Sequence, residues 1–210
     1  MRLTLLAAGT APAGIFQNSI HLNHVMTIGT AIHPDYAAGT WALDKAHSEL
    51  SFTVRHLQIS KVRGVFHDFD VTITAGEHLE DASIAATIDM GSIDTGNEMR
   101  DGHLKTNDFF KIDEFPTATF VSTSIQGTPD DFTVTGDLTL RGVTRPVTLK
   151  GEFGGINTDA QGNVHAGAEV RGKVSRGDFG IEWNAPLEKG GLLLGDEVTL
   201  GIDLQVVLQP

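Results

Sequence analysis

Basic side chains gather on two short segments of a chain that is acidic overall, with 27 acidic and 15 basic residues and a formal net charge of −12. They are Arg55, His56, Lys61 and Arg63 on the first segment, and Arg100, His103 and Lys105 on the second. If both segments lie at one site, these groups face the polar head of a ligand. Alternatively they form ion pairs with Glu98, Asp101 and Asp108. Exposed ion pairs are common and contribute only about 0–1 kcal/mol, so the sequence leaves both interpretations open.

Nine histidines raise the question of a metal site. They are His21, His24, His33, His47, His56, His67, His78, His103 and His165. A zinc site needs several ligands brought together from a common element, yet the sequence contains neither a His-x-x-x-His nor a His-x-His pair. We therefore expect ordinary surface histidines, with no metal site and no cofactor.

Nucleophilic and acid–base chemistry also lacks a clear signature. The chain has no cysteine. No serine stands in a Gly-x-Ser-x-Gly motif, the nucleophile elbow of many hydrolases. The acidic pairs Glu80-Asp81, Asp113-Glu114 and Asp130-Asp131 fall in expected turns, where solvated carboxylates are normal. We predict no catalytic residue and no enzyme. The alternative is a lipid-modifying enzyme in which His56 or His103 serves as acid or base.

The elements that would position these groups are strands, because apolar and polar residues alternate with period two over most of the chain. Strands are predicted at 40–45, 48–55, 65–75, 82–90, 117–125, 132–141, 146–154, 164–175 and 197–208. The first two form one bent strand, which leaves eight. No helical segment is long enough to cover such sheets, so we predict an all-β fold, an eight-stranded antiparallel barrel whose lumen just holds one small ligand.

The two basic segments interrupt the alternation and are expected at the rim of the barrel. Residues 56–61 are predicted to form a single helical turn. Residues 97–105 are predicted to form a short helix capped by Asn97. Of the basic residues, we expect Arg55, His56, Arg63, Arg100 and His103 to meet a ligand at the mouth.

One parity of the strands is apolar and is assigned to the interior. The lumen is expected to be lined by Phe52, Val54, Val71, Ile84, Ile88, Phe120, Leu138, Leu140, Leu149, Val170, Leu200 and Ile202. Several inward positions are small, among them Ala86, Gly136 and Gly172, which favours a lumen that side chains do not fill. A filled core remains the alternative if large residues such as Trp41, Phe69, Phe120 and Phe153 occupy that space.

A chain of ordered motifs covering residues 40–208 resembles the YceI-like family of lipid-binding proteins. The motifs include Asp44-x-x-His47-Ser48, Phe52-x-Val54-Arg55-His56-Leu57, Arg100-Asp101-x-His103-Leu104-Lys105, Gly136-Asp137-Leu138-Thr139-Leu140-Arg141-Gly142 and Asp178-Phe179-Gly180-Ile181. The resemblance implies a lipocalin-like barrel around a long apolar chain, typically a polyisoprenoid, with no established catalytic cycle. Gly177 stands where a serine is common in the family, so no head-group role is carried over to that turn.

The expected function is to bind and carry, or sequester, a polyisoprenoid or another long-chain amphiphile. The alternatives are the lipid-modifying enzyme and an interaction or stress module with a filled core. The negative charge disfavours nucleic acid, and no stretch is apolar enough for stable insertion into a membrane. The sequence is compatible with a homodimer, because the edge surfaces of small barrels often pair.

We assign residues 1–39 to a leader and 40–210 to the barrel. The leader begins with a weak apolar run, Leu3–Ala8, and a small-residue segment after it, which together loosely imitate a signal peptide. The other interpretation is that Met26 is the natural start. Many relatives have an obvious signal peptide, whereas this one is weak, so a cytoplasmic protein is expected and secretion is the alternative.

Overall fold

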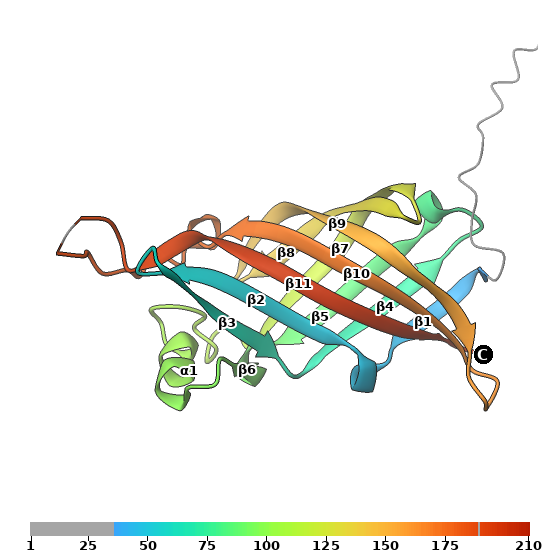
Figure 1. Cartoon of the computed structure of the whole chain (residues 1–210), viewed down its shortest axis with the longest axis horizontal. Helices are drawn as coiled ribbons and strands as arrows, with labels where there is room; N and C mark the ends of the chain where they lie inside the picture. The colour runs from blue at the N-terminus through green and yellow to red at the C-terminus, as the bar shows by residue number, and fades with distance from the viewer. Residues whose placement is uncertain (1–35, 189) are drawn as a thin grey trace, which may run out of the picture.

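The computed structural model describes residues 36–188 and 190–210 and consists of a single sheet of 11 strands with one short α-helix (Figure 1). The strands are β1 (Gly39–Leu43), β2 (Glu49–His56), β3 (Ser60–Phe66), β4 (Phe69–Ala75), β5 (Ser83–Asp89), β6 (Ile93–Asp94), β7 (Thr117–Thr128), β8 (Asp131–Leu140), β9 (Val143–Thr158), β10 (Val164–Ser175) and β11 (Leu194–Leu208). The helix is α1 (Glu98–Lys105). The predicted leader lies outside the described residues except for its last few positions.

The sheet closes on itself because one strand is bent and pairs along both halves with the same neighbour. β1 pairs with the end of β11, with Trp41 opposite Leu208, and β2 pairs with the beginning of β11, with Phe52 opposite Leu200. The bend contains a short turn in which the Asp44 carboxylate accepts a hydrogen bond from the Ala46 N–H. β3 and β4 form the second bent strand. The predicted eight-stranded antiparallel barrel is therefore confirmed.

The predicted helical turn at residues 56–61 is wrong. His56 and Ser60 are instead the last paired residues of a tight β2–β3 hairpin. At its tip Leu57 and Gln58 adopt positive φ angles of 53° and 63°. Two consecutive left-handed residues match the twist of antiparallel strands, but the sequence of such a turn is normally Asn-Gly or Asp-Gly. Because that signal is missing here, the sequence does not reveal the hairpin, and the strand predicted at 65–75 begins too late. Residues 60–75 form two strands, β3 and β4.

Helix α1 begins as predicted. Asn97 is its N-cap, and the side-chain oxygen of Asn97 accepts a hydrogen bond from the Arg100 N–H at 3.0 Å. The helix lies against β6, beside the free edge of β3, at the end of the barrel that also carries the β2–β3 hairpin (Figure 1). α1 therefore covers an end of the barrel that the strands alone leave open.

Glycines that the sequence placed inside the barrel are contact points rather than empty space. A Cβ added to Gly136 would overlap the ring of Phe120, and one added to Gly172 would overlap the side chain of Leu149. The expectation that Gly136 and Gly172 leave the lumen open is therefore wrong. A large side chain from the adjacent strand packs directly against each of these glycines.

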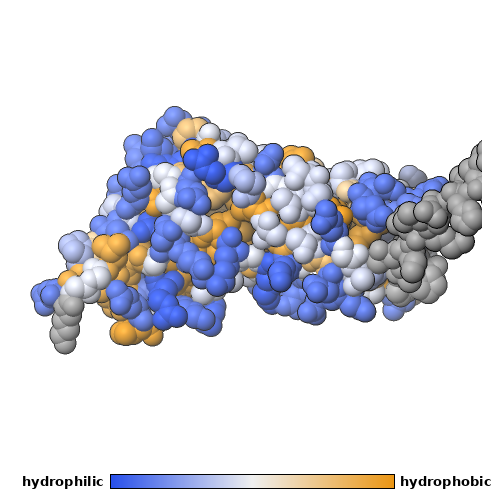
Figure 2. All heavy atoms as spheres, turned by 90° about the horizontal axis from the view of Figure 1, so that it is seen from above, coloured by the Kyte–Doolittle hydropathy of each residue, from blue (hydrophilic) through white to orange (hydrophobic). Residues whose placement is uncertain are grey.

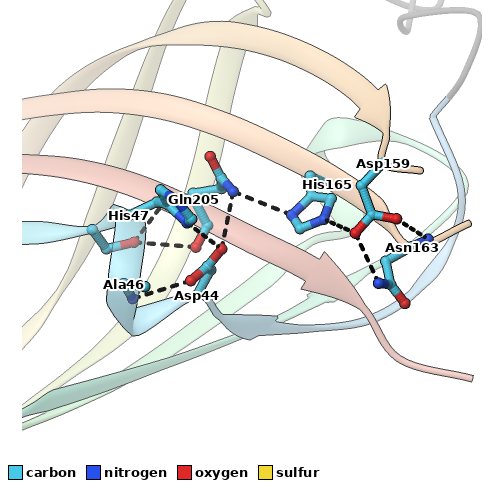
Figure 3. A network of polar contacts seen from close by, with 8 residues as sticks. Asp44, Ala46, His47, Asp159, Asn163, His165 and Gln205 are labelled. Atoms are coloured by element: carbon cyan, nitrogen blue, oxygen red, sulfur yellow. Dashed lines mark hydrogen bonds and ion pairs between the residues drawn. The ribbon is translucent and has the colours of Figure 1, made fainter. Parts of the chain in front are cut away.

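A chain of polar contacts joins the β1–β2 bend to the turn between β9 and β10 (Figure 3). The Gln205 amide nitrogen lies 3.0 Å from an Asp44 carboxylate oxygen and 3.2 Å from Nδ1 of His165. His165 Nε2 lies 3.1 Å from the Asp159 carboxylate, which also accepts from Asn163. Hydrogen bonds from Asn163 and His165 hold the pKa of Asp159 well below its usual value, and the hydrogen bond with His47 lowers the pKa of Asp44.

Candidate functional site

The barrel contains a cavity of about 570 Å³ at the end covered by α1. Its walls are built from inward residues of the barrel strands, together with residues of α1, the following loop and the segment 179–194. Nearly all of these side chains are aliphatic or aromatic. The polar ones are Ser51, His56, Asn97, Arg100, His103 and Arg176. The site is therefore an apolar chamber with a few polar groups, and none of the described residues that line it is a carboxylate.

Six of the predicted lumen residues line this cavity: Phe52, Val54, Ile88, Leu138, Leu140 and Leu200. Ile84 lines a smaller cavity of about 140 Å³ in the other half of the barrel. The remaining five, Val71, Phe120, Leu149, Val170 and Ile202, belong to the packed core and line neither cavity. They face the interior as expected but lie outside both cavity walls, because alternation reveals which face a residue occupies but not how tightly that level is packed.

The two cavities are separated by side chains that line neither of them, and we call five of these residues the waist. On β11, for example, Leu200 lines the larger cavity and Leu204 the smaller one, and Ile202 lies between them. β5 and β8 repeat this order, with Ala86 and Gly136 in the middle position. On β7 and β10, Phe120 and Val170 are among the residues that lie between the two linings. The waist consists of Ala86, Phe120, Gly136, Val170 and Ile202.

The predicted mouth residues divide into two groups. His56, Arg100 and His103 line the larger cavity, but Arg55 and Arg63 do not and are exposed. The reason is the parity of the hairpin: His56 shares the inward face of β2 with Val54, whereas Arg55 points outward and donates to the Gln58 carbonyl. Arg55 and Arg63 therefore lie outside the cavity wall, in contrast to His56, Arg100 and His103.

Arg100 is held by neutral acceptors. Its Nε donates to the Thr95 hydroxyl at 2.7 Å and its Nη2 to the Thr95 carbonyl at 2.8 Å. Among the residues that the structure describes, no carboxylate forms an ion pair with it. The ion-pair alternative for the second basic segment does not hold for this residue.

His103 has a carboxylate partner, as the ion-pair interpretation of the basic segments predicts. Its Nε2 lies 2.8 Å from the Asp108 carboxylate, and its ring packs edge-on against Phe109 and Trp183, with centroid distances of 5.0 and 4.9 Å. These contacts link α1 to the loop after it and to the segment that carries Trp183. His103 therefore connects the three segments that cover the cavity.

Arg176 lines the same cavity and was missed in the sequence. It is 8% exposed, the one buried charged side chain in the described part of the chain. Its Nε donates to the Gly195 carbonyl at 3.0 Å, and its Nη1 donates to the carbonyls of Ile181 and Trp183 at 2.9 and 2.8 Å. Burial lowers the pKa of its guanidinium. A signal existed, since Arg176 continues the inward parity of Gly172 and Val174 on β10.

Large hydrophobic side chains are exposed around the mouth of the cavity. Ile59 at the β2–β3 tip is 85% exposed, and Met99, which also lines the cavity, is 87% exposed. Leu192 is 53% exposed and belongs to the segment whose Leu193 carbonyl accepts from the Leu57 N–H. Figure 2 shows hydrophobic surface among polar side chains at this end of the molecule. An apolar ligand would thus meet an apolar entrance.

Within the described ranges, no three histidine or acidic side chains are grouped so that they could hold a metal ion. The two histidines closest in sequence, His21 and His24, lie outside those ranges. None of the helices in the described part is both long and apolar enough to cross a membrane.

Comparison with known proteins places these features in a family. Residues 41–206 match the YceI-like domain. The UPF0312 protein SAS2572 of Staphylococcus aureus strain MSSA476 is 41% identical over 160 residues, which span 75% of this chain and 91% of that protein.

Solved structures share the barrel. The Campylobacter jejuni YCEI protein superposes with a TM-score of 0.65 at 30% identity, covering 80% of this chain and 97% of that one. A polyisoprenoid binding domain from Saccharophagus degradans superposes with a TM-score of 0.57 at 16% identity, covering 82% of this chain and all of that one. At that identity the second likeness shows the fold alone.

Proposed function

Because this chain belongs to the YceI-like family, we propose that it binds a long-chain apolar ligand, a polyisoprenoid in the first place, inside the barrel and carries or sequesters it without catalysis. The observation that carries the proposal is the apolar cavity of about 570 Å³ beneath α1. The polyisoprenoid binding domain of Saccharophagus degradans, which shares the fold, supports this class of ligand.

The physical chemistry of the cavity fits such a ligand. Sites for small molecules typically measure about 300–1,000 Å³, and this cavity falls within that range. Each methylene group moved from water into an apolar site contributes about 0.8 kcal/mol, so a chain of a few isoprene units gains substantial affinity without directional contacts. Selectivity for the chemical type of chain is then weak, and discrimination must come from chain length and from the head group.

The cavity supports binding better than the enzyme alternative. General acid–base catalysis needs an ionisable group within reach of the reacting atoms, and no carboxylate is among the described residues that line the cavity. Of the two histidines named for that alternative, His103 has its Nε2 engaged by Asp108. His56 lines the cavity without an ion-pair partner among the described residues, so no carboxylate is placed to assist it as an acid or base. The filled-core alternative is supported at the waist but not on either side of it, where the cavities lie.

The direct test is an organic extract of the purified protein, analysed by mass spectrometry, followed by titration of the delipidated protein with farnesol and longer isoprenoid alcohols. We expect a co-purified lipid and saturable binding that strengthens with chain length. An extract without lipid, together with no binding of any isoprenoid, would overturn the proposal.

A further inference from the structure

The guanidinium of Arg176 is only partly used by the protein. Nε and Nη1 donate to the carbonyls of Gly195, Ile181 and Trp183. Nη2 has no acceptor among the described residues, and no carboxylate there forms an ion pair with Arg176. Three carbonyls therefore fix the orientation of the group and leave one nitrogen available.

The available nitrogen retains accessible surface, and it belongs to a residue of the cavity wall. Every fully buried side-chain nitrogen or oxygen in the described part of the protein has a hydrogen-bond partner, so Nη2, which has none, must retain accessible surface. Arg176 as a whole is only 8% exposed, and it forms part of the cavity wall. The chamber is thus the place where a ligand can reach Arg176, and its other walls are largely apolar.

A buried cation without a carboxylate partner is costly, and an anion that enters its site recovers part of that cost. Among the described residues, Asp196 is the carboxylate whose charge acts on Arg176, where it raises the pKa of the guanidinium and partly offsets the effect of burial, but the two side chains form no ion pair. Its carboxylate instead accepts hydrogen bonds from the Gly177 N–H and the Ser175 hydroxyl. Asp196 thus fixes the turn after β10, while the charge of Arg176 stays available to a ligand.

We propose that Arg176 binds an anionic head group, a phosphate or a carboxylate, of the chain that occupies the cavity. This inference rests on the proposed function and specifies the ligand's polar end. A second guanidinium supports it, because Arg100 lines the same cavity, is held by Thr95 and has no ion-pair partner in the described part of the chain. Two oriented cations, with no carboxylate among the described lining residues, make a wall suited to an anion rather than to a neutral alcohol or amide.

The test compares three ligands that share one chain: farnesyl phosphate, farnesoic acid and farnesol. In the wild-type protein we expect the phosphate, the carboxylate or both to bind about 10- to 100-fold more tightly than the alcohol, the range that one charge-assisted hydrogen bond supplies. The phosphate and carboxylate arms distinguish the two head groups. Equal affinity for all three ligands would overturn the inference, whereas binding of none would overturn the proposed function itself.

Variants then locate the effect. Arg176→Gln should remove most of the preference for the anion, with a far larger loss of affinity for the anionic ligands than for farnesol. Circular dichroism and a cooperative urea transition show whether the variant is folded. Arg63→Gln, which removes an exposed cation outside the cavity, is the matched control and should keep the preference. If Arg176→Gln does not fold, Arg100→Gln is the second variant and should reduce the preference in the same direction. A preference that survives removal of Arg176, or that falls equally in Arg63→Gln, would overturn the assignment.

Discussion

The ring of Phe120 on β7 lies against the bare backbone of Gly136 on β8, so closely that a Cβ at Gly136 would overlap it. Phe120 is 8% exposed and packs with Val134, Leu149 and Val170 of the same core cluster. On its own strand it lies between Ala118, which lines the larger cavity, and Ile125, which lines the smaller one. This ring is the largest side chain of the waist and the main barrier between the two cavities.

Removing the ring should lengthen the chain that the barrel accepts. In the wild-type protein, affinity for a series of isoprenoid alcohols should rise with each added unit until the larger cavity is full, and then level off. Phe120→Ala opens a path into the second cavity, so the affinity should keep rising for about one further unit, at about 0.8 kcal/mol per buried methylene. Isothermal titration across the series measures the chain length at which affinity levels off.

Phe132→Ala is the matched control for chain length. Phe132 lies against Gly151 as Phe120 lies against Gly136, but it lines the smaller cavity and is not part of the waist. Both substitutions should cost about 3–5 kcal/mol in unfolding free energy, as expected for loss of a buried phenyl ring. Only Phe120→Ala should move the point at which affinity levels off. A shift of the same size in both variants would show that the waist does not limit the ligand.

Replacing a glycine that packs against a large side chain should destabilise the barrel even in the absence of ligand. Gly172→Ala places a methyl group into the side chain of Leu149, and such overpacking typically costs about 1–3 kcal/mol. Gly102→Ala on α1 is the comparison, because nothing lies within 4 Å of a Cβ there and alanine favours a helix over glycine by about 0.5–1 kcal/mol. In urea unfolding of the ligand-free variants, Gly172→Ala should lower the unfolding free energy and Gly102→Ala should raise it. A neutral Gly172→Ala would mean that Leu149 relaxes freely.

The barrel could be predicted because alternation of apolar and polar residues is a local property of each strand, and a strand's two faces are fixed by geometry. The cap at Asn97 is local in the same way. The waist is not, because it depends on which residue of one strand faces a glycine of the next, and that register is set by the whole closed sheet. The sequence therefore suggests open space at Gly136, whereas the ring of Phe120 covers this glycine in the structure.

The polar part of the cavity wall could be predicted only in part, for a related reason. Charge density along the chain drew attention to Arg55 and Arg63, but parity places both on the outside of the hairpin. Arg171 and Lys173 lie near Arg176 in the sequence but point outward, so charge density does not distinguish Arg176 from them. The available signal was that Arg176 directly follows β10 and continues the inward parity of Gly172 and Val174. A lone charged residue on an otherwise apolar face indicates the polar end of a cavity better than a cluster of exposed charges does.

Met99 should contribute to affinity although it is 87% exposed, because its side chain also lines the larger cavity. Met99→Ser is expected to weaken farnesol binding several-fold, through loss of apolar area at the entrance, at about 25 cal/mol per Å². Unfolding free energy should change by no more than about 0.5 kcal/mol, as for other surface substitutions. Val121→Ser, at a position that is 55% exposed and remote from the cavity lining, should leave binding unchanged. Equal effects of the two variants would exclude a role for Met99 at the entrance.

Asp159 should make part of the barrel's stability dependent on acid. Hydrogen bonds from Asn163 and His165 lower the pKa of its carboxyl in the folded protein from the ordinary value of 3.8. A group with a depressed folded pKa contributes stability that is present above the unfolded value, about 3.9, and is lost as the pH falls toward the folded one. Asp159→Asn should therefore lower the denaturation midpoint near neutral pH and flatten its decline between pH 5 and pH 2.

The comparison for Asp159 is Asp130→Asn in the β7–β8 turn, whose side chain forms no hydrogen bond or ion pair with the described residues. Its midpoint should follow the wild-type curve across the whole pH range. Urea midpoints measured at half-unit steps of pH give both curves. If Asp159→Asn runs parallel to the wild type below pH 5, the contacts with Asn163 and His165 do not favour the ionised carboxylate, and the network in Figure 3 stabilises the turn by geometry alone.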